Sequence, residues 1–199
     1  LRAFAQQEYG IDLEAETEQV FGAPPLIFKA GLSGEIDGAI NFWHFLAKMK
    51  AAGMRELISV EEAGKALGLD ADTPLLGYYA KESFLAAHPG LAQAFYEASR
   101  EAKDLLASSD EAWEAIRSQM NADNDAEFEA LKRDWVAGIP PRSPVDADAA
   151  AKVLALMAQL GGAELVGDVT AIPDGLFADP DQTRYQTAPE KSIASSARN

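Results

Sequence analysis

Hydrophobic and polar positions divide the chain into a front section of short alternating segments and a longer section of helical stripes. Four short runs of apolar or β-forming residues have the length of strands: 16–21, 36–41, 55–60 and 75–80. Residues 1–10 read as the end of a helix, and helices are also predicted over 24–32 and 42–52. Strands alternating with ten-residue helices favour right-handed crossovers and a mainly parallel sheet, so the first third is expected to be α/β.

After the fourth run the pattern becomes helical throughout. Four amphipathic stripes begin near Leu91, Trp113, Phe128 and Ala150. Ser109, Asn124 and Asp146 precede the last three and are expected to cap them. Three or four strands make only a partial sheet and give four amphipathic helices little to cover, so part of the core is expected to lie outside this sequence.

Composition argues against several kinds of partner but says less about the fold. The chain has 199 residues, 48% of them hydrophobic, and a formal net charge of −15, which argues against nucleic acid and anionic lipid as partners. It has no cysteine, which removes disulfides and thiolate chemistry. No run of eighteen apolar residues occurs, so no direct membrane insertion is expected. The first residues carry no signal peptide, and the start reads as the interior of a longer protein.

Four stretches in combination resemble a known family. They are Gly22-Ala23-Pro24-Pro25 with its helix, Gly34-Glu35-Ile36-Asp37-Gly38-Ala39, the stretch from Tyr78 to Pro89, and the long helix over 91–107. Together they resemble the C-terminal part of the substrate-binding proteins of nitrate/sulfonate/taurine-type ABC importers. The resemblance covers roughly residues 1–177, with Gly38 standing where the family usually has alanine.

The resemblance implies part of a two-lobe, periplasmic-binding-protein-like α/β fold with a helix-rich C-terminal section. Residues 1–74 would belong to the second lobe without its first strand, and residues 75–177 would return to the first lobe. Residues 178–199 lie outside the resemblance, and their polar sequence without periodicity predicts a disordered tail. The N-terminal lobe is expected upstream. The implied function is that of a non-enzymatic, periplasmic solute-binding component without a cofactor, which captures a small molecule between its lobes and delivers it to an ABC permease in the inner membrane.

Two loops beyond the predicted strands are the candidate ligand-binding site, because ligands of open parallel sheets lie beyond the carboxyl ends of the strands. Their residues are Ala23, Pro24, Asn41, Phe42, Trp43 and His44. The amide and imidazole supply polar contacts and the two aromatic rings supply flat walls, which favours a small organic solute: a sulfonate, another organic acid or a pyrimidine-like molecule. Simple packing of the aromatic residues is an equally weighted interpretation.

Other candidates carry less weight. Tyr78 and Tyr79 are expected to be packing residues, His88 to belong to a helix start, and the acidic run at 123–125 to cap a helix, because a calcium loop would need glycine where Phe128 stands. The two histidines have no metal-like spacing, and no catalytic motif occurs, so neither a metal nor catalysis is expected. A thiamine-pyrimidine-synthase-like enzyme and the ligand-sensing domain of a regulator remain alternatives; the first uses a cysteine-rich motif, which this chain lacks.

Overall fold

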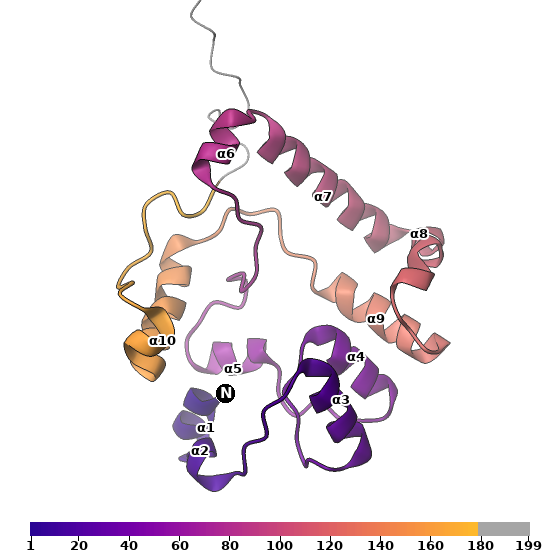
Figure 1. Cartoon of the computed structure of the whole chain (residues 1–199), viewed down its shortest axis with the longest axis vertical. Helices are drawn as coiled ribbons and strands as arrows, with labels where there is room; N and C mark the ends of the chain where they lie inside the picture. Colours follow the sequence, from indigo (N-terminus) through magenta and orange to yellow (C-terminus); the bar gives the residue numbers. More distant parts are fainter. Residues whose placement is uncertain (179–199) are drawn as a thin grey trace, which may run out of the picture.

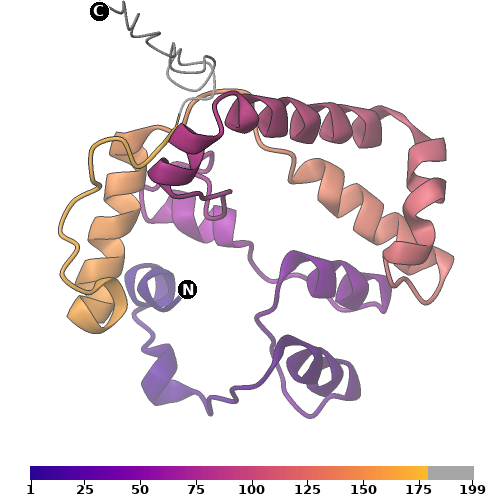
Figure 2. The ribbon, with the colours of Figure 1, turned by 45° about the horizontal axis from the view of Figure 1, so that its top comes forward.

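The computed structural model describes residues 1–178, which fold into helices joined by open segments (Figure 1). The helices are α1 (Arg2–Tyr9), α2 (Leu13–Glu16), α3 (Pro24–Ser33), α4 (Trp43–Ala51), α5 (Val60–Ala66), α6 (Glu82–Ala87), α7 (Leu91–Ser108), α8 (Asp110–Ile116), the 3-10 helix η1 (Arg117–Gln119), α9 (Asp125–Ala137) and α10 (Ala147–Val166). They lie in an open arrangement rather than a closed bundle (Figure 2). Apart from Ala178, the tail expected at 178–199 lies outside the described residues.

The prediction of an α/β fold, as part of a two-lobe architecture, is wrong for this chain. Residues 1–178 contain no β-strand. The runs expected as strands at 16–21, 36–41 and 75–80 are connecting segments, and the run at 55–60 ends in the first residue of α5. A strand exists only when a neighbouring backbone pairs with its N–H and C=O groups. None of these runs has such a neighbour in the described part of the chain.

Helix boundaries follow the caps that the sequence indicates. Gly10 ends α1 in the left-handed conformation, with φ of 68°. Ser109 Oγ accepts a hydrogen bond from the Ala112 N–H at the start of α8, and Asp146 caps α10 in the same way. Three short helices were not predicted: α2, α5 and α6. The second of these begins with a capping box, in which Ser59 and Glu62 each accept from the other's backbone N–H.

The best-packed contact joins α4 to α9. Ala47 on α4 is completely buried and clusters with Ala130 and Leu131 on α9. On the other side of α4, Gly31 brings α3 close, because a Cβ at this position would lie 3.2 Å from the buried methyl of Met49. Small residues at both contacts let three helix backbones approach one another, which accounts for the adjacency of α3, α4 and α9 in both ribbon views (Figures 1 and 2).

A second cluster holds α8 and η1 against α9. Trp113 is buried, and its ring meets that of Trp135 edge to face, with 5.4 Å between centroids. Its indole N–H donates to the Leu106 carbonyl oxygen over 2.6 Å. The Arg117 guanidinium of η1 lies 4.2 Å from the centroid of the buried Phe128 ring of α9. These contacts hold the corner between α7 and α9, which is formed by α8 and η1 on the right of Figure 1.

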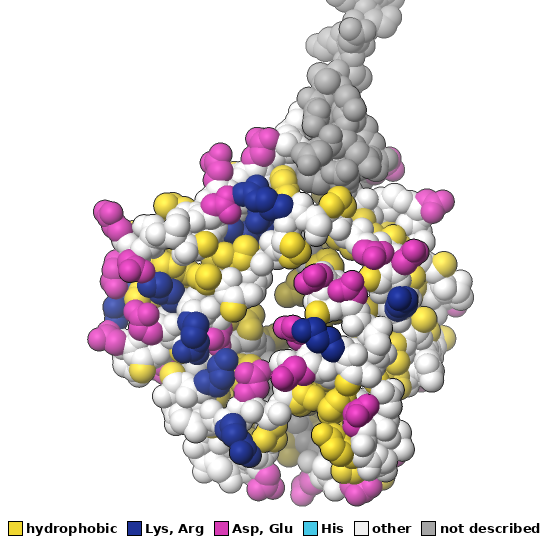
Figure 3. Space-filling view, turned by 180° about the vertical axis from the view of Figure 1, so that it is seen from behind, with side chains coloured by type: hydrophobic (Ala, Val, Ile, Leu, Met, Phe, Trp, Pro, Cys, Tyr) yellow, Lys and Arg dark blue, Asp and Glu magenta, His cyan; other side chains and the backbone are white. Residues whose placement is uncertain are grey.

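Much apolar surface remains outside these two clusters. Only ten hydrophobic side chains are buried in the described residues, whereas twenty-five large ones are exposed. Figure 3 shows hydrophobic side chains gathered in several patches between charged ones over one face of the molecule. One helix, α10, is long and apolar enough to cross a membrane by length and composition alone, although Gly162 interrupts its helical backbone. The described helices therefore do not complete a core among themselves.

Candidate functional site

The six predicted site residues come from two loops that a single side chain joins. The side-chain amide of Asn41 donates to the Pro24 carbonyl oxygen over 2.9 Å, and its oxygen accepts from the Phe42 N–H, also over 2.9 Å. Ala23 is the residue before α3, and Pro24 is its first residue. Asn41 thus ties the start of α3 to the start of α4. Because one N–H and one lone pair of the amide are used in this way, its main role is to position the loop.

Three aromatic rings surround His44 beside this link. Its ring lies nearly parallel to that of Phe42, with 6.1 Å between centroids, and meets that of Trp43 edge to face at 5.6 Å. The centroid of the Phe45 ring lies 4.5 Å from that of His44, and the Phe45 ring also contacts Phe28 of α3, with 5.4 Å between centroids. Phe42 and Trp43 nevertheless remain 60% and 46% exposed, so they are not packing residues of a closed core.

The first turn of α4 adds donors that the sequence reasoning missed. Phe42 occupies the N-cap position and makes no side-chain cap hydrogen bond. The backbone N–H groups of Trp43, His44 and Phe45 make no hydrogen bond within residues 1–178. Such groups at the positive end of a helix attract an anion. The sequence does contain a signal for these free donors. Phe42 stands at the N-cap, where Ser, Thr, Asp or Asn usually accepts a hydrogen bond from one of them.

The cations of α4 lie at its other end and are occupied. Lys48 pairs with Glu127 at 3.1 Å, and Lys50 pairs with Asp134 at 2.7 Å. The chemistry open to a ligand at residues 41–44 is therefore backbone N–H donation, flat apolar contact and the imidazole of His44. This chemistry is suited to binding a small molecule.

Other residues weighed from the sequence lie elsewhere. Tyr78 contacts Phe95 of α7, whereas Tyr79 is fully exposed. The interpretation of Tyr79 as a packing residue is therefore wrong within the described residues. His88 follows the last residue of α6, and its ring lies 4.6 Å from that of Phe84. Asn124 caps α9 through a hydrogen bond from the Glu127 N–H, as expected for the acidic run.

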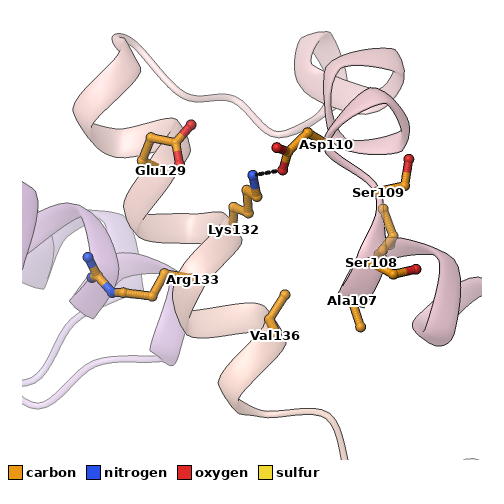
Figure 4. Close-up of a pocket in the computed structure, with 9 residues that line it drawn as sticks. Ala107, Ser108, Ser109, Asp110, Glu129, Lys132, Arg133 and Val136 are labelled. Carbon is orange, nitrogen blue, oxygen red and sulfur yellow. Dashed lines mark hydrogen bonds and ion pairs between the residues drawn. The ribbon is translucent and has the colours of Figure 1, made fainter.

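A surface hollow of about 340 Å³ separates the α7–α8 corner from α9 (Figure 4). Lys132 of α9 reaches across it and pairs with Asp110, while Ser108 and Ala107 line the facing side. The hydrogen bond to Asp110 raises the pKa of Lys132, so this ammonium stays charged. The Lys132 ammonium in this hollow is therefore already bound to a carboxylate, and Glu129 and Arg133 also line the hollow.

A larger hollow, of about 590 Å³, lies between the start of α10 and residues 170–178. Its lining is mostly small or apolar, and its largest hydrophobic side chains are Leu154, Ile172, Leu176 and Phe177. Among the described residues that line it, Asp148 and Asp174 are ionisable and none is cationic.

Comparisons with known proteins add no family to this description. Neither the models of known protein families nor the curated protein sequences give a match to this chain. Function must accordingly be inferred from the loop at residues 41–44 and from the sequence resemblance.

Proposed function

We propose that the chain is part of a solute-binding component of an ABC importer, and that its loop at residues 41–44 contacts a small organic solute. The observation that carries the proposal is the hydrogen bond from Asn41 to the Pro24 carbonyl, which joins the two loops singled out from the sequence. The same loop holds an exposed aromatic pair and a histidine within ring contact of both.

The solute class follows from the groups that the loop presents. Three backbone N–H groups at the start of α4 favour an anionic head group, such as a sulfonate or a carboxylate. Phe42 and Trp43 supply apolar contact for a carbon skeleton, which bare nitrate lacks. Among the solutes considered, an organic sulfonate or another organic acid therefore fits better than a neutral pyrimidine. The net charge of −15 does not oppose this, because the nearby helix terminus determines the local potential.

The family assignment is supported by sequence alone. The turn at 22–25, the stretch 34–39 and the stretch from Tyr78 to Pro89 occur in the order found in nitrate/sulfonate/taurine-type binding proteins. In that role the chain would bind its solute without catalysis and present it to a permease in the inner membrane. The large exposed apolar surface is consistent with a component that works in contact with further polypeptide.

A thermal-shift screen tests the proposal. The chain is mixed with alkanesulfonates such as taurine, with short organic acids and with pyrimidines, and the melting temperature is measured. A solute at 100 times its Kd should add about 2.7 kcal/mol to the free energy of unfolding. Trp43→Ala should abolish the shift, while Tyr79→Ala, which removes a fully exposed aromatic ring outside the loop, should leave it unchanged.

Two results would count against the site and the function separately. A shift that survives Trp43→Ala but is lost in a variant elsewhere would move the site away from residues 41–44. The absence of a shift with every sulfonate, acid and pyrimidine tested would remove the support for solute binding altogether.

A further inference from the structure

Two Asp-Gly dipeptides occur in the sequence, at Asp37-Gly38 and at Asp174-Gly175. Such a dipeptide is reactive, because the backbone nitrogen that follows an aspartate can attack its side-chain carboxyl carbon and close a five-membered ring. Glycine hinders this attack least, since it has no Cβ. The reaction also requires the backbone at the aspartate to rotate, so the local structure decides which of the two sites reacts more readily.

Asp174 and Gly175 are the two central residues of a hydrogen-bonded turn. The Leu176 N–H donates to the Pro173 carbonyl oxygen over 3.2 Å, and Gly175 has a φ of 74°. A positive φ at this position is found in type II turns, which need glycine or asparagine there. The hydrogen bond spans the Asp174–Gly175 peptide and restrains the backbone on both sides of it. Ring closure at Asp174 therefore requires the turn to open first.

Asp37 and Gly38 lie in the connection between α3 and α4 (Figure 1), where no such hydrogen bond restrains them. Both residues are exposed. The Gly38 N–H makes no hydrogen bond to another backbone group in the described part of the chain, and a Cβ at Gly38 would meet no atom within 4 Å. The attacking nitrogen is therefore accessible, and the backbone at Asp37 can rotate towards ring closure without first breaking a turn.

We propose that Asp37 is a site of spontaneous isomerisation to isoaspartate in the folded protein, and that it reacts in preference to Asp174. The Gly38 nitrogen bonds to the Asp37 Cγ, and the carboxyl hydroxyl leaves with the amide proton as water, which gives a succinimide. One water then opens the ring at the main-chain carbonyl carbon of Asp37, so that Gly38 stays bonded through Cγ. One water is released and one is consumed, and no oxidant, reductant or cofactor is needed.

Isomerisation lengthens the backbone by one carbon just before two contacts of the α3–α4 connection. Ala39 lies against α3, because a Cβ at Gly31 would be 3.6 Å from the Ala39 Cβ. Asn41 donates to the Pro24 carbonyl oxygen at the start of the same helix. The product also carries a carboxylate derived from the main chain, which is the group that isoaspartyl methyltransferases esterify. The reaction involves residues 37 and 38 alone, so it does not depend on the proposed function.

Prolonged incubation of the folded chain, followed by peptide mapping with electron-transfer fragmentation, measures isoaspartate at both sites. Asp37 should accumulate isoaspartate about fivefold faster than Asp174, which is the factor expected if a hydrogen bond of ordinary strength must open at Asp174. The same measurement in urea, where the turn is unfolded, should bring the two rates close together. This comparison separates the effect of the folded structure from that of the flanking residues.

Methylation by an isoaspartyl methyltransferase supplied with S-adenosylmethionine gives a second readout. Asp37→Glu is the matched variant, because it keeps the charge but would have to close a six-membered ring; it should remove most of the methyl incorporation. Asp174→Glu should leave most of it in place. Absence of isoaspartate at Asp37, or its formation there no faster than at Asp174 in the folded chain, would overturn the proposal. An excess at Asp37 that persists unchanged in urea would overturn the preference by structure.

Discussion

Lys48 on α4 and Glu127 on α9 form an ion pair with 3.1 Å between the ammonium nitrogen and a carboxylate oxygen, and only 15% of each side chain is exposed. The same ammonium donates to the Asn121 carbonyl oxygen, and the same carboxylate accepts from the Asp123 N–H over 3.1 Å. The pair therefore connects α4 both to α9 and to the turn before it. Low exposure keeps water from screening it as fully as a surface pair.

We predict that Lys48→Met lowers the free energy of unfolding by about 1–3 kcal/mol, because it leaves the Glu127 carboxylate half-buried without its cation. Urea unfolding followed by circular dichroism measures the change. Lys65→Met is the control, since Lys65 pairs with Glu61 on the surface of α5, with 58% and 60% of the two side chains exposed. Its cost should be much smaller than that of Lys48→Met, because solvent screens this exposed pair. Equal costs for the two variants would show that the α4–α9 pair is screened like any surface pair.

Acid stability should depend on the same carboxylate. Burial raises the pKa of Glu127, but the hydrogen bond from the Asp123 N–H and the Lys48 ammonium together bring it below its ordinary value of 4.5. The folded protein thus holds this proton less readily than the unfolded chain. The contribution of the Glu127 carboxylate to stability is present above pH 4.5. It is lost as the pH falls below that value towards the pKa of Glu127 in the folded protein.

Glu127→Gln should remove this part of the pH dependence. Unfolding by urea, measured at a series of pH values from neutral down through 4.5, should show a smaller loss of stability for the variant than for the wild type. The Glu62 carboxyl, whose pKa the Ser59 N–H lowers, is present in both proteins and cancels in the comparison. Parallel pH profiles would mean that Glu127 titrates alike in the folded and unfolded states.

The contact between α4 and α9 should not tolerate a larger side chain. Ala47 is completely buried against Ala130 and Leu131, so Ala47→Leu should force the helices apart and cost about 1–3 kcal/mol. Ala98→Leu, on the exposed part of α7, makes the same substitution without that contact and should be close to neutral. A tolerated leucine at position 47 would mean that α4 and α9 are packed less closely than described.

The local signals of the sequence predicted helices well and strands badly. Caps and periodicity depend on residues within one or two turns, so Gly10, Ser109 and Asp146 could be assigned without knowledge of the fold. A strand depends on a partner far along the chain, and the runs at 36–41 and 75–80 have none in the described residues. The capping box at Ser59 was a local signal for α5 that the strand assignment overlooked.

The candidate site was predictable as a set of residues but not as an arrangement. Loop position and side-chain chemistry selected Asn41 and Pro24 separately, whereas their hydrogen bond depends on how α3 and α4 fold back on each other. The contact between the Phe45 and His44 rings was not predicted from the sequence. The pairing of Lys48 with Glu127 joins segments too far apart in sequence for any periodicity to indicate it.

At the start of α9, a local helix cap and an ion pair to another helix share the residue Glu127. Asn124 accepts a hydrogen bond from the Glu127 N–H over 3.0 Å, and Glu127 also carries the ion pair to α4. Asn124→Ala should cost about 1 kcal/mol through the lost cap alone. If the cap also positions Glu127 for Lys48, the double variant Asn124→Ala with Lys48→Met should cost less than the two single variants added together. Urea unfolding of all four proteins measures this coupling, and strictly additive costs would show that the cap and the ion pair act independently.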